Sequence, residues 1–411
     1  ILTPGDRPDV LVAMNPAALK AYFDTQGSGT IFALYDLFAG GNFSRITIFA
    51  LGIMPYISAS IIIQLLQAVI PFFEKLAKEG EEGRKKITQY TRYGTVALSV
   101  VQAIGIAFFL ENMAEGVVPN PGMFFRLITI ITMTAGTIFV MWLGEQITER
   151  GIGNGISLII MIGIVARYPA DWLDTIRALK VGTLTPLRLG LLIVIMVAII
   201  ASVILITQGQ RRIPVQYAKR IVGRRVYGGK AQYIPLRVNT AGVIPIIFAQ
   251  SIIMFPSTLA AFFQGSEAMQ TISRIFSPSS WLYESLYAII IIFFTYFYTA
   301  IILNPVDLAE NMQKYGGFIP GIRPGKRTSD YIDRILTRVT LPGAIFLAFI
   351  AILPDLMIRW GKLPASVYFG GTGLLIVVGV MLDTLQQIET HLLMRHYDGF
   401  MKKGHLRGRR F

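Results

Sequence analysis

Residues 46–70 read ITIFALGIMPYISASIIIQLLQAVI, a stretch without a charged side chain that is interrupted by Gly52-Ile53-Met54-Pro55. A second charge-free stretch, residues 238–266, carries the same interruption as Gly242-Val243-Ile244-Pro245. Each stretch is long enough to cross a bilayer core of about 30 Å as a helix. Matched Gly/Pro-broken spans in two halves of a chain indicate where internal repeats meet, which is usually a path through the membrane. Chance is the competing explanation, because Gly and Pro are common in membrane helices.

Composition places the chain among polytopic membrane proteins, because 53% of its 411 residues are hydrophobic and only 15% are charged. Cysteine is absent, which excludes disulfides, thiolate metal sites and cysteine nucleophiles. All three His residues fall in the C-terminal tail, and no catalytic pair of side chains lies within an apolar run. We therefore expect no enzymatic centre, metal site or cofactor. The lack of ionisable residues at membrane depth also disfavours an ion-coupled carrier.

Nine charge-free runs are candidate membrane spans, and together they predict an all-α polytopic membrane protein. The runs that begin at residues 151 and 339 are short for a bilayer. The nine runs are residues 46–70, 93–110, 127–144, 151–166, 189–210, 238–266, 285–306, 339–354 and 363–382.

The positive charges predict the orientation of these spans, because cytosolic loops are rich in Lys and Arg. The basic loops are residues 71–92, 211–237 and 307–338, and the tail after residue 389 belongs with them. The first run then enters from outside although the chain begins with Ile, so we expect that a preceding span is missing from a fold of ten. Five spans in each half would place the two Gly-x-x-Pro segments in opposite orientations, as an inverted repeat.

Four segments describe the expected organisation. They are an external segment 1–45, an N-terminal half 46–180 with four spans, a C-terminal half 181–388 with five spans, and a cytosolic tail 389–411. The external segment contains a short apolar piece, residues 29–41, in which one helical face is formed by Ile31, Leu34, Tyr35 and Phe38. Spacing alone favours an amphipathic helix at the membrane interface over a piece that folds back into a cavity.

A stripe on the first run changes from apolar to polar. Its members share a helical face within roughly 80 degrees, and they are Ile53, Ile57, Ser60, Gln64 and Gln67. Such a stripe suits a wall that is wet on the cytosolic side and narrows to an aliphatic constriction. Helix packing with Gln side chains bonded to a neighbouring helix explains it equally well. The repeat extends to the second run, where Ile247 follows Pro245 by two residues, as Ile57 follows Pro55.

The segment 211–237 carries eight Lys and Arg and no acidic residue. Its prolines and glycines argue against a helix, and we predict a hairpin in which 225–227 and 230–233 flank Gly228-Gly229. The charge would attract phosphate in structured RNA or in lipid headgroups, although positive-inside topology alone explains part of it. A second turn, residues 316–327, holds Arg323 between prolines.

Several motifs occur in order along the chain, and together they resemble one family. They are residues 50–57, 78–86, 89–94, 147–155, 210–214, 223–227, 243–245 and 320–325. The chain resembles the SecY family, the channel-forming subunits of the bacterial Sec protein translocase.

This resemblance implies an hourglass of ten spans in two inverted halves, which passes unfolded secretory polypeptides outward and releases hydrophobic segments sideways into lipid. The residues that correspond to the family's pore ring are Ile53, Ile57, Ile160, Ile247 and Ile376, and a sixth position has no assigned residue. The plug helix corresponds to residues 29–41. The lateral gate lies between the first and second Gly-x-x-Pro runs, with polar residues Ser60, Gln64, Gln102 and Asn239.

The resemblance also implies partners: small SecE- and SecG-type membrane subunits, the SecA ATPase, the ribosome through its RNA, secretory polypeptides and membrane lipids. Nucleotide hydrolysis belongs to a partner, and no cofactor is implied. The expected location is the bacterial cytoplasmic membrane, with the C-terminus in the cytosol. The residues expected to dock the ribosome or SecA are Arg211, Arg212, Lys219, Arg220, Arg224, Arg225 and Arg323.

Two other functions stay open at this point. An inverted-repeat solute transporter would show saturable transport of small molecules. A membrane scaffold would only bind ribosomes or anionic lipid and would never contact a translocating polypeptide.

Overall fold

The computed structural model describes residues 47–403 apart from several internal segments. These segments are residues 112–117, 119, 183, 218–219, 223–224, 228–231, 263–279 and 362–370. The predicted external segment 1–45 therefore lies outside the described residues.

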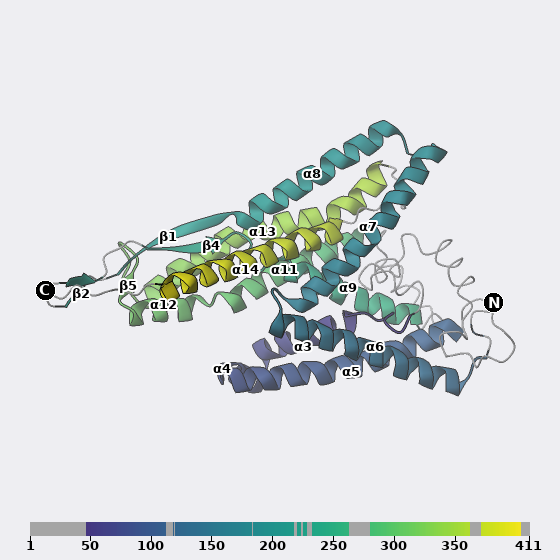
Figure 1. Cartoon of the computed structure of the whole chain (residues 1–411), viewed down its shortest axis with the longest axis horizontal. Helices are drawn as coiled ribbons and strands as arrows, with labels where there is room; N and C mark the ends of the chain where they lie inside the picture. Colours follow the sequence, from purple (N-terminus) through teal and green to yellow (C-terminus); the bar gives the residue numbers. More distant parts are fainter. Residues whose placement is uncertain are drawn as a thin grey trace.

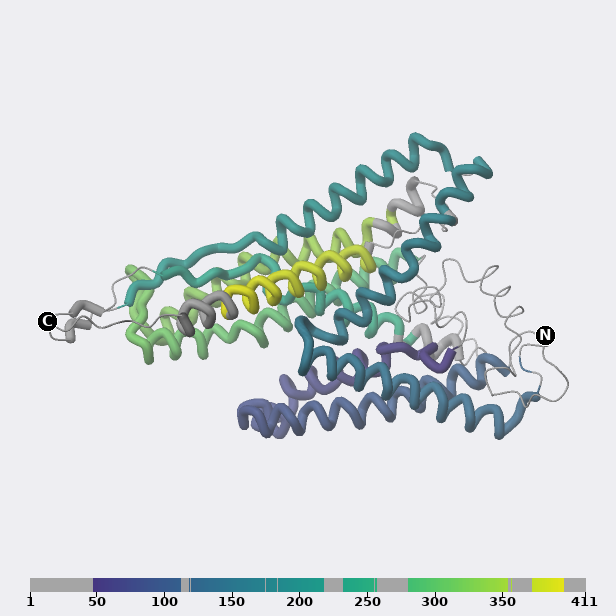
Figure 2. Tube along the Cα trace, viewed as in Figure 1, coloured from purple at the N-terminus to yellow at the C-terminus, as the bar shows by residue number. Residues whose placement is uncertain are grey.

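The described chain is predominantly helical, as the sequence predicts. Its helices are α3 (Met54–Val69), α4 (Pro71–Lys78), α5 (Glu81–Glu111), α6 (Met123–Arg150), α7 (Gly155–Val181), α8 (Pro186–Gln208), α9 (Ile244–Phe262), α11 (Trp281–Ile302), α12 (Pro305–Lys314), α13 (Lys326–Gly361) and α14 (Gly371–Lys403). Figure 2 shows α3 to α6 together in one group, with α11, α13 and α14 in a second group beside it. The tail predicted to begin at residue 389 is a continuation of α14.

Each of the nine predicted runs overlaps one of these helices. By length and composition, seven described helices could cross a membrane, and an eighth is counted if α3 and α4, bent by 97°, form one span. The apolar part of α9, Ile244–Met254, is shorter than a full span. The predicted total of nine spans therefore stays a prediction.

The two Gly-x-x-Pro motifs begin helices, whereas the sequence interpretation placed them as interruptions within spans. Gly52 and Gly242 have φ angles of 54° and 64°, in the left-handed region that favours glycine. Helices α3 and α9 each begin two residues later, so that Pro occupies the second helical position. A proline is tolerated there because the N–H groups of the first turn have no partner within the helix.

The first helical hydrogen bonds repeat between the two motifs. The Ile57 amide donates to the Ile53 carbonyl at 3.1 Å, and the Ile247 amide donates to the Val243 carbonyl at 3.3 Å. The likeness seen in the sequence is therefore a likeness of local geometry.

A small antiparallel sheet joins the two basic loops and corrects the predicted hairpin. Strand β1 (Gln210–Tyr217) lies between β4 (Gln232–Arg237) and β5 (Gly317–Phe318). A separate pair is formed by β2 (Arg220–Val222) and β3 (Arg225–Tyr227). Residues 225–227 thus pair with 220–222, and Gln232 and Tyr233 of the predicted second strand pair with β1, so the predicted hairpin pairing is wrong. Gly228-Gly229 lies outside the described residues.

Burial explains why β1 pairs with β4. Ile213 and Val215 alternate with exposed residues along β1, and they pack with Leu236 of β4 and with apolar side chains of α12 and α13. Figure 1 shows this sheet, α4 and α12 at the same end of the long axis, as the shared charge of their loops predicts.

Replacing Gly52 or Gly242 with Ala should lower the apparent melting temperature of the purified protein. A left-handed conformation costs a non-glycine residue roughly 1–2 kcal/mol, and Asn should lose less because it tolerates that region better. Thermal unfolding in detergent measures the effect.

Gly190 of α8 is the matched control. Its backbone is not left-handed and a Cβ there would meet nothing within 4 Å, so Gly190→Ala should be neutral or stabilising. Equal falls in melting temperature at Gly52, Gly242 and Gly190 would contradict the left-handed conformation assigned to Gly52 and Gly242.

Candidate functional site

The five isoleucines predicted to form a ring all belong to one buried cluster. Their exposed fractions are Ile53 1%, Ile57 3%, Ile160 1%, Ile247 4% and Ile376 0%. They come from the turn before α3 and from α3, α7, α9 and α14, which are far apart in the sequence. The structure brings them together, and their role as a pore ring stays a prediction.

Many hydrophobic side chains pack around these isoleucines. Phe248 of α9 meets the ring of Phe294 edge-on, with centroids 5.9 Å apart, and meets Tyr298 in the same way at 5.8 Å. Leu110 of α5 and Phe125 of α6 belong to the same cluster. The branched aliphatic side chains of the isoleucines offer no hydrogen bonds to a passing chain and exclude water from a narrow constriction.

The four predicted gate residues lie on or beside α3, α5 and α9, which contact one another. The Gln64 side chain donates to Ser60 Oγ at 3.1 Å, so its partner is on its own helix and not on a neighbour. Asn239 donates through Nδ2 to the Gly242 carbonyl at 3.1 Å and thereby stabilises the turn before α9. Gln102 Oε1 and Asn239 Oδ1 are buried and have no partner within the described residues.

The predicted docking residues are only partly described. Arg211 and Arg212 are exposed on β1, and Arg323 is exposed in the turn that follows β5. A hydrogen bond stabilises that turn, because Thr328 Oγ1 donates to the Arg323 carbonyl at 2.9 Å. The side chains of Arg220 and Arg225, in β2 and β3, lie outside the described residues, as do Lys219 and Arg224.

The four predicted plug residues also lie outside the described residues. They are Ile31, Leu34, Tyr35 and Phe38.

The sequence interpretation missed how α7 is placed against α6. Asn154 caps α7 by accepting from the amides of Ile156 and Ser157 at 3.1 and 3.3 Å. Gly155 approaches α6 so closely that a Cβ would overlap the Gly144 carbonyl. Thr148 Oγ1 donates to that carbonyl at 2.8 Å and accepts from the Gly155 amide at 2.9 Å. The Gly-Asn-Gly order was a usable signal for a capped, close-packed helix start.

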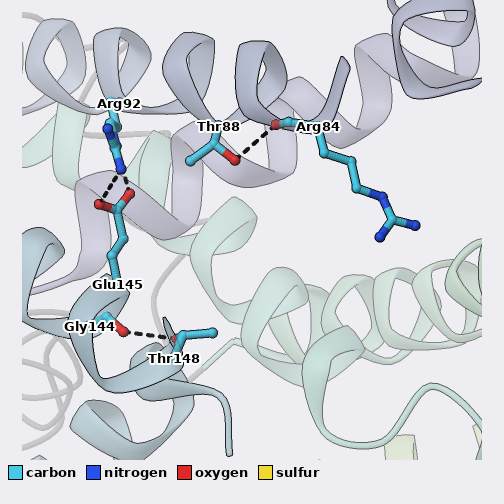
Figure 3. A network of polar contacts seen from close by, with 6 residues as sticks. All are labelled: Arg84, Thr88, Arg92, Gly144, Glu145 and Thr148. Atoms are coloured by element: carbon cyan, nitrogen blue, oxygen red, sulfur yellow. Dashed lines mark hydrogen bonds and ion pairs between the residues drawn. The ribbon is translucent and has the colours of Figure 1, made fainter. Parts of the chain in front are cut away.

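An ion pair between α5 and α6 was also missed. Arg92 donates from Nε and Nη2 to the two carboxylate oxygens of Glu145, at 2.9 and 2.8 Å (Figure 3). The Glu145 side chain is 12% exposed and that of Arg92 is 45% exposed. Because the partners are 53 residues apart, neither loop composition nor helical spacing could indicate the pair.

These observations define a class: a multi-pass helical membrane protein with a closed aliphatic centre and a basic sheet at one end. The SecY family model matches residues 47–385. The chain belongs to the SecY family.

The similarity to known relatives extends over nearly the whole chain. The protein translocase subunit SecY of Escherichia coli strain K12 is 51% identical over 397 residues, which cover 95% of this chain and 89% of the relative. A solved structure described as a protein conducting channel matches with a TM-score of 0.62 and 18% identity, covering 95% of this chain and 94% of its own. Sec61 in a canine ribosome-channel complex matches with a TM-score of 0.55 and 17% identity, with the same coverage.

Removing Arg92 should destabilise the protein more than removing the charge of Glu145. Arg92→Ala leaves a largely buried carboxylate without its partner, whereas Glu145→Gln leaves a half-exposed guanidinium that water can solvate. We expect a loss of about 2 kcal/mol or more for the first and about 1 kcal/mol for the second.

Thermal unfolding of the two variants measures the difference, and the charge-swapped pair Arg92→Glu with Glu145→Arg should recover part of the loss. Equal effects from both single variants would contradict this account of the pair.

Proposed function

We infer that this chain is the channel-forming subunit of a protein translocase in the cell membrane, through which unfolded secretory polypeptides pass. The single observation that carries this function is the convergence of five buried isoleucines, from segments across the whole chain, in a member of the SecY family. The solute transporter considered from the sequence finds no support among the relatives.

In the proposed mechanism the five isoleucines form a constriction that seals around a chain of any sequence. Aliphatic side chains adapt to a passing polypeptide without binding it, because they offer no hydrogen bonds. At rest they pack against one another and exclude ions. We propose that an hourglass of ten spans, in two inverted halves 46–180 and 181–388, surrounds this constriction, and that residues 29–41 plug it from outside.

The proposed lateral gate lies between α3 and α9. These helices contact each other, and each begins two residues after a left-handed glycine, next to the central cluster. A hydrophobic segment could leave between them if they separate, and the proposed polar gate residues lie on α3 (Ser60 and Gln64), on the neighbouring α5 (Gln102) and just before α9 (Asn239). Buried polar groups without partners, here Gln102 Oε1 and Asn239 Oδ1 within the described residues, weaken packing and so favour opening.

The basic sheet is the proposed docking surface for the ribosome or a SecA-type ATPase, which supplies the energy. Two loops with exposed Arg residues meet in it, which concentrates positive charge toward phosphate or acidic partners. Because positive loops are retained on the inside, we propose that this end and the C-terminus are cytosolic. Small SecE- and SecG-type subunits and membrane lipids would cover the apolar outer helices.

A single Cys at Ile57 tests the constriction, because the chain has no other cysteine. A stalled secretory polypeptide with one Cys should form a disulfide with Ile57→Cys in the complete, active translocase. The matched control is Val194→Cys on α8, whose side chain is 65% exposed on the outside of the helices. If neither position cross-links, or both do equally, the constriction is not where we place it.

Replacing Arg211, Arg212 and Arg323 with Glu tests the docking surface. Ribosome binding should weaken, and the slope of log affinity against log salt should fall by roughly 0.7–0.9 for each phosphate that is no longer neutralised. Co-sedimentation of the reconstituted complex at several salt concentrations measures both.

The matched control for the docking surface is Arg188→Glu, an exposed residue at the opposite end of α8. Unchanged affinity and slope in the triple variant would rule out this surface as the RNA contact.

A further inference from the structure

One stretch of α14, residues 379–387, touches the starts of two other helices that carry ring isoleucines. Gln387 Oε1 accepts from the Gly153 amide at 2.8 Å, two residues before α7 begins. Gly153 has a φ of 89°, and a Cβ there would lie 3.3 Å from Thr384 Oγ1, so the turn before α7 rests directly on α14.

The neighbouring residue, Gln386, makes the equivalent contact toward α9. Its Oε1 accepts from Arg237 Nη1 at 2.9 Å, and Arg237 is the last residue of β4, from which the chain turns into α9. Asp383, one turn earlier on α14, lies beside the turn before α9, because a Cβ at Gly242 would be 3.6 Å from its Oδ2. Nearer the ring, a Cβ at Gly379 would overlap the Val243 side chain.

These contacts tie three ring-bearing helices together on one side of the ring. Ile376 lies eleven residues before Gln387, or about 16 Å along α14. Ile160 lies seven residues after Gly153. Ile247 lies ten residues after Arg237. Ile160 and Ile247 are thus only a few residues from segments that α14 contacts, and Ile376 is on α14 itself. A shift of α7 or α9 relative to α14 at these contacts would therefore displace the ring isoleucines.

We propose that Gln386 and Gln387 are positioning residues, which hold α7 and α9 in register with α14 and thereby keep the ring closed at rest. Both hydrogen bonds are exposed to solvent. Water competes for such bonds, so each is weak alone and can be released when the channel opens. This inference rests on the proposed pore ring and adds residues outside it.

Among the described residues both glutamines are hydrogen-bonded through Oε1, as an acceptor, and this permits a sharp comparison. Gln387→Met keeps the shape of the side chain and removes the acceptor, whereas Gln387→Glu keeps an acceptor in the same place. In vesicles that contain the complete translocase without a translocating chain, Gln387→Met should raise the ion leak about fivefold, the factor that removal of one hydrogen bond produces in a closed–open equilibrium. Gln387→Glu should leak like the wild type.

The double variant Gln386→Met with Gln387→Met should leak more than either single variant. Glu389→Met, at an exposed position on the same helix, is the control for a general loss of polarity. A purely structural role predicts lower melting temperatures with an unchanged leak, so unfolding is measured on every variant.

Ile160→Ser separates this inference from the pore ring itself. If Ile160→Ser leaks and the Met variants do not, or if Gln387→Glu leaks as much as Gln387→Met, the positioning role is wrong and the ring stands. If Ile160→Ser does not leak, the ring assignment fails and the positioning role fails with it.

Discussion

Burial of the first part of α9, Ile244–Met254, is the constraint on which the rest of the structure depends. Ile247 and Phe248 pack into the cluster that contains the five isoleucines, while Ile246 and Ile253 pack into a second cluster with α8, α11, α13 and α14. A mostly apolar helix such as this one is stable only where protein or lipid surrounds it. Because α9 supplies side chains to both clusters, it joins the two groups of helices. The residue at which α9 begins therefore decides which side chains enter each cluster.

Two isoleucines of the centre could be singled out from the sequence because a local motif marks their positions, whereas Ile160 and Ile376 were assigned only through the resemblance to the SecY family. Ile57 and Ile247 follow a Gly-x-x-Pro turn by a set number of residues, and such a turn specifies where a helix begins. The same motifs were interpreted wrongly as breaks, since spacing shows that a helix is disturbed but not on which side of the disturbance it lies. Contacts between distant segments, such as Arg92 with Glu145, leave no periodic pattern and could not be predicted.

The pairing of strands in the sheet could not be predicted for a related reason. Glycine pairs indicate hairpins locally, but the partner of β1 is decided by the burial of Ile213 and Val215 against α12 and α13. The result is a direct connection: β1 follows α8, and β4 leads through a short turn into α9. A partner that binds the basic sheet therefore acts on a surface that is continuous, along the backbone, with the helix at the centre of the fold.

The left-handed glycines have an electrostatic consequence. They start α3 and α9 beside the central cluster, so the first turns of two helices lie at the proposed constriction, and α3 has no side-chain cap there. A helix N-terminus carries the equivalent of about half a positive charge. These two first turns therefore contribute positive potential at the aliphatic centre through peptide groups and not through charged side chains. That contribution follows the backbone path, so a side-chain substitution that preserves both helices leaves it in place.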